Sequence, residues 1–246
     1  MKRTLPLLLI LVLVVVFAYL FATKGVISAP TELRPLGKFY LEKCMIGGDF
    51  AAGSPEAVTS ILWDYRGLDT LFETSVFFLA IIGNLMLFSF KVKEVVREQE
   101  LTLVVRSVTK IAAVMILAVS ASIALHGHLT PGGGFQGGSA LAVAPLLVLV
   151  AFSRKILETS GLSLKRAIVI RSLGLMGILL TALLPLILGG YIMQNLPIFP
   201  KYIADQLTSG SLIFYNVFEY LAVGAGFTAV FLLISIPEKN FVEEEK

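Results

Sequence analysis

Long apolar runs, separated by short polar or glycine-rich stretches, dominate the hydropathy pattern of this chain. A helix needs about 20 apolar residues to cross roughly 30 Å of hydrocarbon. Six segments predict such helices: Leu5–Ala22, Leu68–Phe90, Ile111–Leu125 with an extension back toward Leu101, Ala140–Phe152 with an extension back into a glycine-rich stretch, Ile168–Met193 and Leu212–Ile236. The pattern therefore predicts an all-α, polytopic membrane helix bundle with about six transmembrane helices.

The composition excludes an ordinary soluble protein. Hydrophobic residues make up 57% of the chain and charged residues 15%, against roughly 45–50% and about 25% in a typical soluble domain. The net charge is only +3, so the basic residues give no reason to expect nucleic-acid binding. The single cysteine, Cys44, excludes an internal disulfide and any all-cysteine iron–sulfur or zinc site made by this chain alone. We expect no cofactor in this chain and a lipid bilayer as its surroundings.

The first apolar segment, Leu5–Ala22, follows Lys2 and Arg3 and has features of both a secretory signal and a membrane anchor. Its apolar stretch is longer than the usual core of about 7–15 residues in a signal peptide. No clear small-x-small cleavage site follows it. We therefore expect an anchor that is retained.

Lysine and arginine are unevenly divided between the two sides of the predicted membrane. The side that holds the N-terminus receives 14 of these residues and the other side receives 6. Because basic residues concentrate in cytoplasmic loops, both termini are predicted to be cytoplasmic, in the cell membrane. The most highly charged internal stretch, residues 91–106, predicts a join between two domains, 1–100 and 101–246. No internal repeat supports an inverted-repeat transporter.

A glycine-rich stretch, residues 126–138 (HGHLTPGGGFQGG), lies between the third and fourth predicted spans. Five of the seven residues from Gly132 to Gly138 are glycine, which permits positive φ and very close backbone approach. The stretch lacks the Gly-Lys-Ser/Thr ending of a phosphate-binding loop. His126 and His128 have too few ligands nearby for a metal site. Two interpretations stay open: a tight turn between helices, or irregular backbone that lines a hydrated cavity.

Two carboxylates open the second predicted span. Asp69 and Glu73 are four residues apart and share one helical face. Such a pair can serve an ion route, but a capping box with Thr70 at the N-cap and Glu73 at N3 explains the same residues structurally. Both interpretations stay open.

Glu219 lies about 10 Å into the sixth predicted span, at 1.5 Å per residue. A charge inside the membrane costs roughly 2.5–3.5 kcal/mol on insertion scales, so Glu219 is a candidate for ion transport. Asn216, one turn earlier, is its expected local partner. The structural alternative is an interhelical hydrogen bond, favoured by the small-residue spacing of Ala222 and Gly226. Arg171 is interpreted as a side chain that snorkels to the cytoplasmic surface.

The region from about Leu101 to Ile236 resembles the MnhB/MrpB family, one of the membrane components of Mrp-type multisubunit cation/proton antiporters. The hallmark of that family is a His-x-x-Pro-Gly-Gly-Gly-Phe-x-Gly-Gly loop. It is matched here by His128, Pro131, Gly132, Gly133, Gly134, Phe135, Gly137 and Gly138. The resemblance implies a component of a sodium- and proton-translocating membrane module.

Upstream, residues 59–83 (TSILWDYRGLDTLFETSVFFLAIIG) resemble the C-terminal part of MrpA, the large component of the same antiporters. The chain therefore resembles a fusion of two Mrp components, an arrangement similar to archaeal membrane-bound hydrogenase and sulfane sulfur reductase complexes. This implies a non-catalytic component whose partners are other Mrp-like membrane subunits and a hydrogenase-like or sulfur-reductase peripheral arm. The resemblance favours an ion route at Asp69 and Glu73, and we expect Glu219 and His128 to line or gate the same route. A purely structural scaffold and a component of a stand-alone antiporter are the alternatives.

Overall fold

The computed structural model of the chain describes residues 4–23, 32–45, 50–87, 91–92, 101–236 and 241–242. Contacts divide the chain into two compact units, Met1–Phe39 and Tyr40–Lys246. In the first unit, α1 (Thr4–Thr23) is an apolar helix whose described side chains, from residue 7 to 23, are all exposed. The short helix α2 (Pro35–Lys43) passes from the first unit into the second.

Within the described part of the second unit, five helices are long and apolar enough to cross a membrane: α4 (Gly67–Leu87), α5 (Leu103–Leu125), α6 (Gly134–Ala151), α8 (Leu164–Ile187) and α9 (Leu212–Ile234). Each overlaps one of the predicted spans, and α1 overlaps the first of them. The predicted all-α membrane bundle is therefore confirmed.

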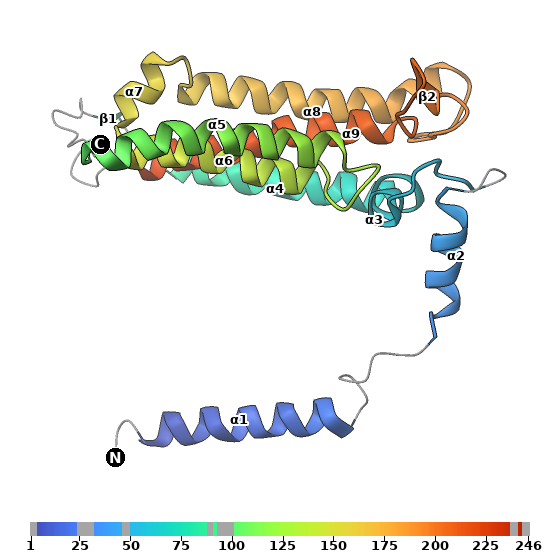
Figure 1. Cartoon of the computed structure of the whole chain (residues 1–246), viewed down its shortest axis with the longest axis horizontal. Helices are drawn as coiled ribbons and strands as arrows, with labels where there is room; N and C mark the ends of the chain where they lie inside the picture. Colours follow the sequence, from blue (N-terminus) through green and yellow to red (C-terminus); the bar gives the residue numbers. More distant parts are fainter. Residues whose placement is uncertain are drawn as a thin grey trace. The chain divides into compact units, whose positions relative to one another are not determined.

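Short elements connect these helices. They are α3 (Ala57–Ser60), the π-helix η1 (Ile61–Tyr65) and α7 (Arg154–Thr159), together with two antiparallel pairs of two-residue strands, β1 (Lys91–Val92) with β4 (Phe241–Val242) and β2 (Tyr202–Ile203) with β3 (Gln206–Leu207). α3 and η1 lead directly into α4, and the β2–β3 hairpin precedes α9. In Figure 1 the hairpin and α7 lie at opposite ends of the bundle.

Helix α9 is central to the packing of the second unit. It runs alongside α6 and α8, α6 also packs along α5, and α4 touches α9 more lightly (Figure 1). Glycines allow these close approaches: a Cβ at Gly174 of α8 would lie 2.7 Å from the Phe218 carbonyl oxygen, and one at Gly138 of α6 would lie 2.8 Å from that of Tyr220. Small residues at helix contacts let backbones approach in this way in membranes.

The predicted fifth span, Ile168–Met193, is wrong at its C-terminal end because α8 stops at Ile187. Gly189 has a φ of +85°. The Gly190 N–H donates to the Pro185 carbonyl at 2.8 Å, and the Gly189 N–H donates to the Leu186 carbonyl at 3.3 Å. This is the Schellman arrangement, in which a left-handed glycine satisfies the last carbonyls of a helix. The apolar residues after it lie in turns.

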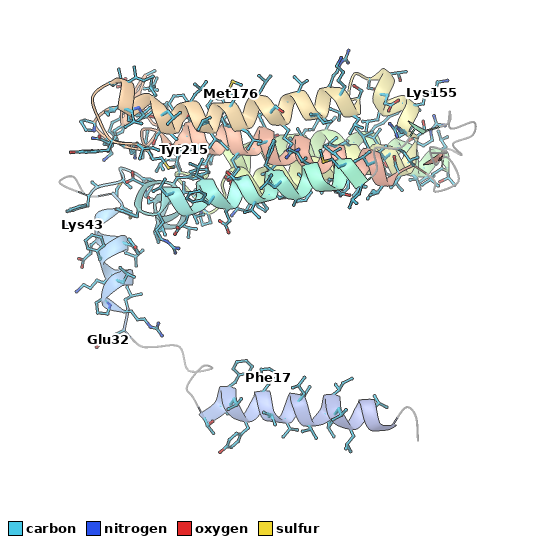
Figure 2. The ribbon with its side chains drawn as sticks, turned by 180° about the vertical axis from the view of Figure 1, so that it is seen from behind. Phe17, Glu32, Lys43, Lys155, Met176 and Tyr215 are labelled. Atoms are coloured by element: carbon cyan, nitrogen blue, oxygen red, sulfur yellow. The ribbon has the colours of Figure 1, made fainter. Side chains whose placement is uncertain are left out.

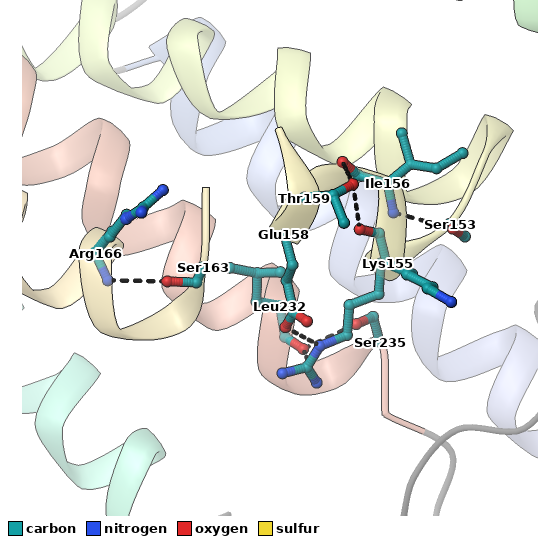
Figure 3. Close-up of polar contacts among 10 residues, drawn as sticks. Ser153, Lys155, Ile156, Glu158, Thr159, Ser163, Arg166, Leu232 and Ser235 are labelled. Atoms are coloured by element: carbon teal, nitrogen blue, oxygen red, sulfur yellow. Dashed lines mark hydrogen bonds and ion pairs between the residues drawn. The ribbon is translucent and has the colours of Figure 1, made fainter. Parts of the chain in front are cut away.

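The α7 end of the bundle is held by polar contacts (Figure 3). The Ser163 hydroxyl accepts a hydrogen bond from the Arg166 N–H at 3.4 Å and caps α8. Arg154 forms an ion pair with Glu158 at 2.7 Å and donates to the Leu232 carbonyl at 3.2 Å. The bond from Arg154 to Leu232 joins α7 to α9 at the end away from the glycine-rich loop.

Candidate functional site

A cavity of about 520 Å³ lies among α3, η1, α4, α9 and the glycine-rich loop with the start of α6. We call it the Glu219 cavity. Its polar and loop lining comprises Thr59, Trp63, Thr70, Glu73, Thr74, Gly132, Gly133, Gln136, Asn216 and Glu219. The fold thus brings Glu73 from α4 and Glu219 from α9 to one space, together with the loop that the sequence singled out.

Glu219 is buried, and its carboxylate is held by neutral donors. The Phe135 N–H donates to Glu219 Oε2 at 3.1 Å, and the Gly134 N–H donates to Asn216 Oδ1 at 3.3 Å. Both N–H groups belong to the first turn of α6, where backbone donors have no partner within the helix. The Trp63 side chain is a further hydrogen-bond partner of Glu219. Among the described residues, no cation forms an ion pair with it.

The glycines of the loop make this contact possible. A Cβ at Gly134 would lie 2.6 Å from Glu219 Cβ and 2.7 Å from its Oε2, closer than real Cβ contacts come. Gly133 has a φ of +131°, in the region that favours glycine. The loop therefore forms a tight turn between α5 and α6 and also lines a cavity, so the two interpretations of it are compatible.

The two candidate carboxylates at the start of α4, Asp69 and Glu73, have different surroundings. The capping-box interpretation of Thr70 and Glu73 is wrong, because α4 begins at Gly67 and the Thr70 hydroxyl donates to the Leu62 carbonyl at 2.5 Å. Glu73 is exposed along one side and lines the Glu219 cavity. Asp69 does not line it and instead forms an exposed ion pair with Arg66.

His128 is buried but does not line the Glu219 cavity. Its Nε2 lies 2.8 Å from the Leu207 carbonyl oxygen, which can only accept, so Nε2 carries a proton. The Ser54 hydroxyl donates to the His128 carbonyl. Burial lowers the pKa of His128, which favours the neutral ring. The geometry makes His128 a tie between the glycine-rich loop and the segment that precedes α9.

Arg171 is not a snorkelling side chain, and that interpretation is wrong. The residue is 2% exposed. Its guanidinium donates to the Phe78 carbonyl of α4 at 2.5 Å and lies 4.1 Å from the centre of the Phe78 ring. Because α4 supplies an acceptor and an aromatic face at this depth, the side chain stays inside the bundle instead of reaching the surface.

Asp64 is a candidate that the sequence interpretation missed. Burial raises its pKa to about 6, partly offset by a hydrogen bond with Asn195. It lines a second, wider pocket of about 1190 Å³, which we call the Asp64 pocket and which Asp69 and Lys201 also line. In sequence Asp64 stands among Trp63, Tyr65 and Arg66, a setting typical of a solvated helix flank. Nothing in the sequence shows that Asn195 covers it.

Across the described residues, no group of three or more histidine, cysteine, aspartate or glutamate side chains is arranged to hold a metal ion. The polar groups of the Glu219 cavity are instead carboxylates and neutral donors. Such a set can bind and release protons or contribute oxygen ligands to a monovalent cation.

The glycine-rich loop and the helices around it match a known protein family. Residues 104–229 match the family model described as the domain related to the MnhB subunit of Na⁺/H⁺ antiporter. The chain belongs to this MnhB-related family. The match covers about half of the chain, falls inside the region from Leu101 to Ile236, and confirms the predicted likeness to MnhB/MrpB.

Curated relatives agree with this assignment. An uncharacterised protein of Methanocaldococcus jannaschii is 30% identical over 221 residues, which cover 78% of this chain and 83% of the relative. A Staphylococcus haemolyticus protein that carries the name antiporter subunit mnhB2 is 33% identical over 92 residues, covering 37% of this chain and 63% of the relative.

Two solved structures share the fold. One is the membrane-bound sulfane sulfur reductase, an archaeal respiratory membrane complex: a chain of it matches with a TM-score of 0.71 and 29% identity, covering 96% of this chain and 99% of the other. The Mrp complex from Dietzia sp. DQ12-45-1b matches with a TM-score of 0.71 and 19% identity, covering 99% of this chain and 27% of the longer one. The neighbours are multisubunit membrane complexes, and this chain is a multi-pass membrane protein of the Mrp antiporter-subunit type.

Proposed function

We propose that this chain is a non-catalytic membrane component of an Mrp-type ion-translocating module, and that the Glu219 cavity forms part of a hydrated route for Na⁺ or H⁺. The observation that carries the proposal is the meeting of Glu73 and Glu219 at one cavity beneath the glycine-rich loop. A membrane-embedded carboxylate is expensive to bury, so its placement beside a space, without a paired cation among the described residues, favours a transport role.

The surroundings of Glu219 suit a carboxylate that binds and releases a proton or a cation. Backbone N–H groups and Trp63 orient the side chain without neutralising its charge. Glu73 is on the opposite helix and keeps an exposed side. The negative charge of one carboxylate therefore favours the binding of a cation or a proton at the other. The exposed side of Glu73 faces lipid or a neighbouring protein of the complex. Either ion is compatible with carboxylate oxygens.

The larger assembly is the second part of the proposal. We propose a fusion of an MrpA-like region, residues 1–100, with an MrpB-like region, residues 101–246, with both termini cytoplasmic. The near-complete match to a chain of the sulfane sulfur reductase supports a respiratory complex, in which electron transfer in a peripheral arm drives ion transport. The match of this chain to part of one longer chain in the Dietzia complex supports the fusion.

Charge-neutralising substitutions in the assembled complex test the route. Glu219→Gln keeps an oxygen that can accept the Phe135 N–H and removes the charge. We expect this variant and Glu73→Gln each to reduce Na⁺-dependent proton transport in proteoliposomes by about tenfold or more, a rise of roughly 1.4 kcal/mol or more in the barrier. The amount of purified complex should not change. Glu158→Gln, which alters an ion pair at the α7 end, is the matched control.

A structural scaffold is the competing function, and the close glycine contacts of α6 with α9 favour it. It predicts full transport from both glutamine variants and loss of assembly when the loop is overpacked, for example by Gly133→Leu. Normal transport by Glu219→Gln and Glu73→Gln complexes would reject the route and leave the scaffold.

A further inference from the structure

Two consecutive residues of η1 lie in different hollows of the protein. Trp63 lines the Glu219 cavity, and Asp64 lines the Asp64 pocket. The π-helix is therefore part of the wall between the two spaces. Single turns of π-helix occur frequently at functional sites, and here the turn sets an aromatic and an acidic side chain on either side of one wall.

The wall is closely packed by aromatic rings. Trp63 stacks on Tyr215 of α9 with ring centroids 4.4 Å apart and planes inclined by 2°. Both side chains are almost fully buried and pack with Leu212, Met193 and Ile178 in one apolar cluster. Figure 2 shows Tyr215 enclosed among the helices of the bundle. Stacked rings at this spacing leave no room for a hydrated sodium ion.

Two buried polar groups interrupt the apolar wall. Tyr215 Oη and Asn216 Nδ2 have no hydrogen-bond partner among the protein atoms described. Tyr215 is 0% exposed and Asn216 is 1% exposed. Since the Gly134 N–H donates to Asn216 Oδ1, the amide orientation is fixed and Nδ2 is the free donor. A buried polar group without a partner costs about 1–3 kcal/mol.

Each of these two groups is associated with one of the two cavities. Asn216 lines the Glu219 cavity, and Tyr215 stacks on Trp63, the residue directly before Asp64 of the Asp64 pocket. Buried water commonly satisfies such groups where a polar site offers two or more partners. The carboxylates of Asp64 and Glu219 are additional acceptors on the two sides. The other titratable groups around Asp64 are Tyr65, Arg66, Asp69, Tyr191 and Lys201.

We propose that Tyr215 Oη, Asn216 Nδ2 and bridging water form a proton-selective link between Asp64 and Glu219, which rests on the proposed function of the Glu219 cavity. A proton leaves the Asp64 carboxyl, passes through the Tyr215 hydroxyl and the bridging water as each accepts one proton and releases another, and is taken up by the Glu219 carboxylate. Asp64 is left as a carboxylate that reloads from its pocket. The Trp63–Tyr215 stack blocks hydrated Na⁺ at the same wall.

Tyr215→Phe tests the link, because it keeps the stacked ring and removes only the hydroxyl. We expect proton flux in proteoliposomes containing the full complex, followed with a pH-sensitive dye, to fall by about tenfold or more at unchanged assembly. Tyr220→Phe is the matched control: it lies on the same helix and its hydroxyl is 3.2 Å from that of Ser120. Unchanged flux in Tyr215→Phe would overturn the link, since the orphaned hydroxyl would then be only a packing defect.

Asp64→Asn provides a second test that does not disturb the aromatic wall. We expect a loss of proton flux similar to that of Tyr215→Phe, and a double variant no worse than either single one. If Tyr215→Phe fails to assemble, Asp64→Asn decides, and normal flux in it rejects the link. Loss of transport in Glu219→Gln with normal flux in both Asp64→Asn and Tyr215→Phe would reject the link and leave the Glu219 route intact.

Discussion

Glu219 and Arg171 are both ionisable residues buried in the bundle, yet their surroundings are opposite. Glu219 lies at the glycine-loop end beside a cavity of about 520 Å³ and is oriented by backbone donors. Arg171 of α8 stacks on the ring of Phe78 in α4 and donates a hydrogen bond to the Phe78 carbonyl. Glu219 therefore lies beside a cavity that ions or water can enter, whereas the side chain of Arg171 is fully engaged in contacts that join α8 to α4.

The comparison shows that a charged residue inside a membrane does not by itself mark a transport route. Both side chains carry the cost of burial in a medium of low polarity. What separates them is whether the charge faces a space or a fixed partner. Substitutions that fill the space or remove the partner should therefore have different consequences in the two regions.

The largest effect is expected from filling the contact between α6 and α9. Gly134→Ala places a Cβ 2.6 Å from Glu219 Cβ, and overpacking of this kind typically costs about 1–3 kcal/mol. We expect a clear drop in assembled complex and in its thermal midpoint. Gly83→Ala on α4 is the control, since a Cβ there meets nothing within 4 Å. Equal stability of the two variants would show that the glycine contact is unimportant.

Arg171→Lys should weaken the contact between α4 and α8 by about 1–2 kcal/mol. The planar guanidinium stacks on the Phe78 ring and bonds its carbonyl at the same time, and a compact ammonium cannot do both. The thermal midpoint of the purified complex measures this loss, with exposed Arg166→Lys as the control. Transport per assembled complex should stay within about twofold of the original, a barrier change below roughly 0.5 kcal/mol. A tenfold transport loss would place Arg171 in the ion route and erase the contrast with Glu219.

His128 predicts a smaller, pH-dependent effect at the loop. Burial lowers its pKa below the usual value of 6.5, so the unfolded chain binds more protons than the native one in mildly acidic solution. Stability should therefore fall as the pH drops through and below about 6.5. His128→Gln keeps a donor for the Leu207 carbonyl and should reduce this dependence in thermal melts recorded between pH 8 and 5. Exposed His126→Gln should retain it.

Asp69→Asn should have the smallest effect. Its ion pair with Arg66 is exposed on both sides, and such pairs contribute about 0–1 kcal/mol. Transport and thermal midpoint should remain close to those of the unchanged complex, in contrast to Glu73→Gln one turn further along α4. A loss as large as that of Glu73→Gln would bring Asp69 back into the route.

The sequence predicts local features of the fold well and contacts between distant segments poorly. The length and hydropathy of the apolar segments are sufficient to predict the membrane helices. The spacing of the glycines indicates the loop that lines the Glu219 cavity. The predicted C-terminal end of α8 is misplaced because apolar residues continue past the glycine that ends it. Arg171 is misinterpreted and Asp64 is missed because their partners Phe78 and Asn195 lie 93 and 131 positions away in the sequence.

The π-helix has a consequence for how this region can vary in evolution. The Arg66 N–H donates to the Ile61 carbonyl at 2.9 Å, five positions back instead of the four of an α-helix. One residue fewer between positions 61 and 65 would restore α-helical bonding and turn the residues before the deletion by about 100° relative to α4, the rotation per residue of an α-helix. Homologues that keep both hollows should therefore tolerate substitutions in this turn more readily than single-residue deletions, and its length should vary less than its composition.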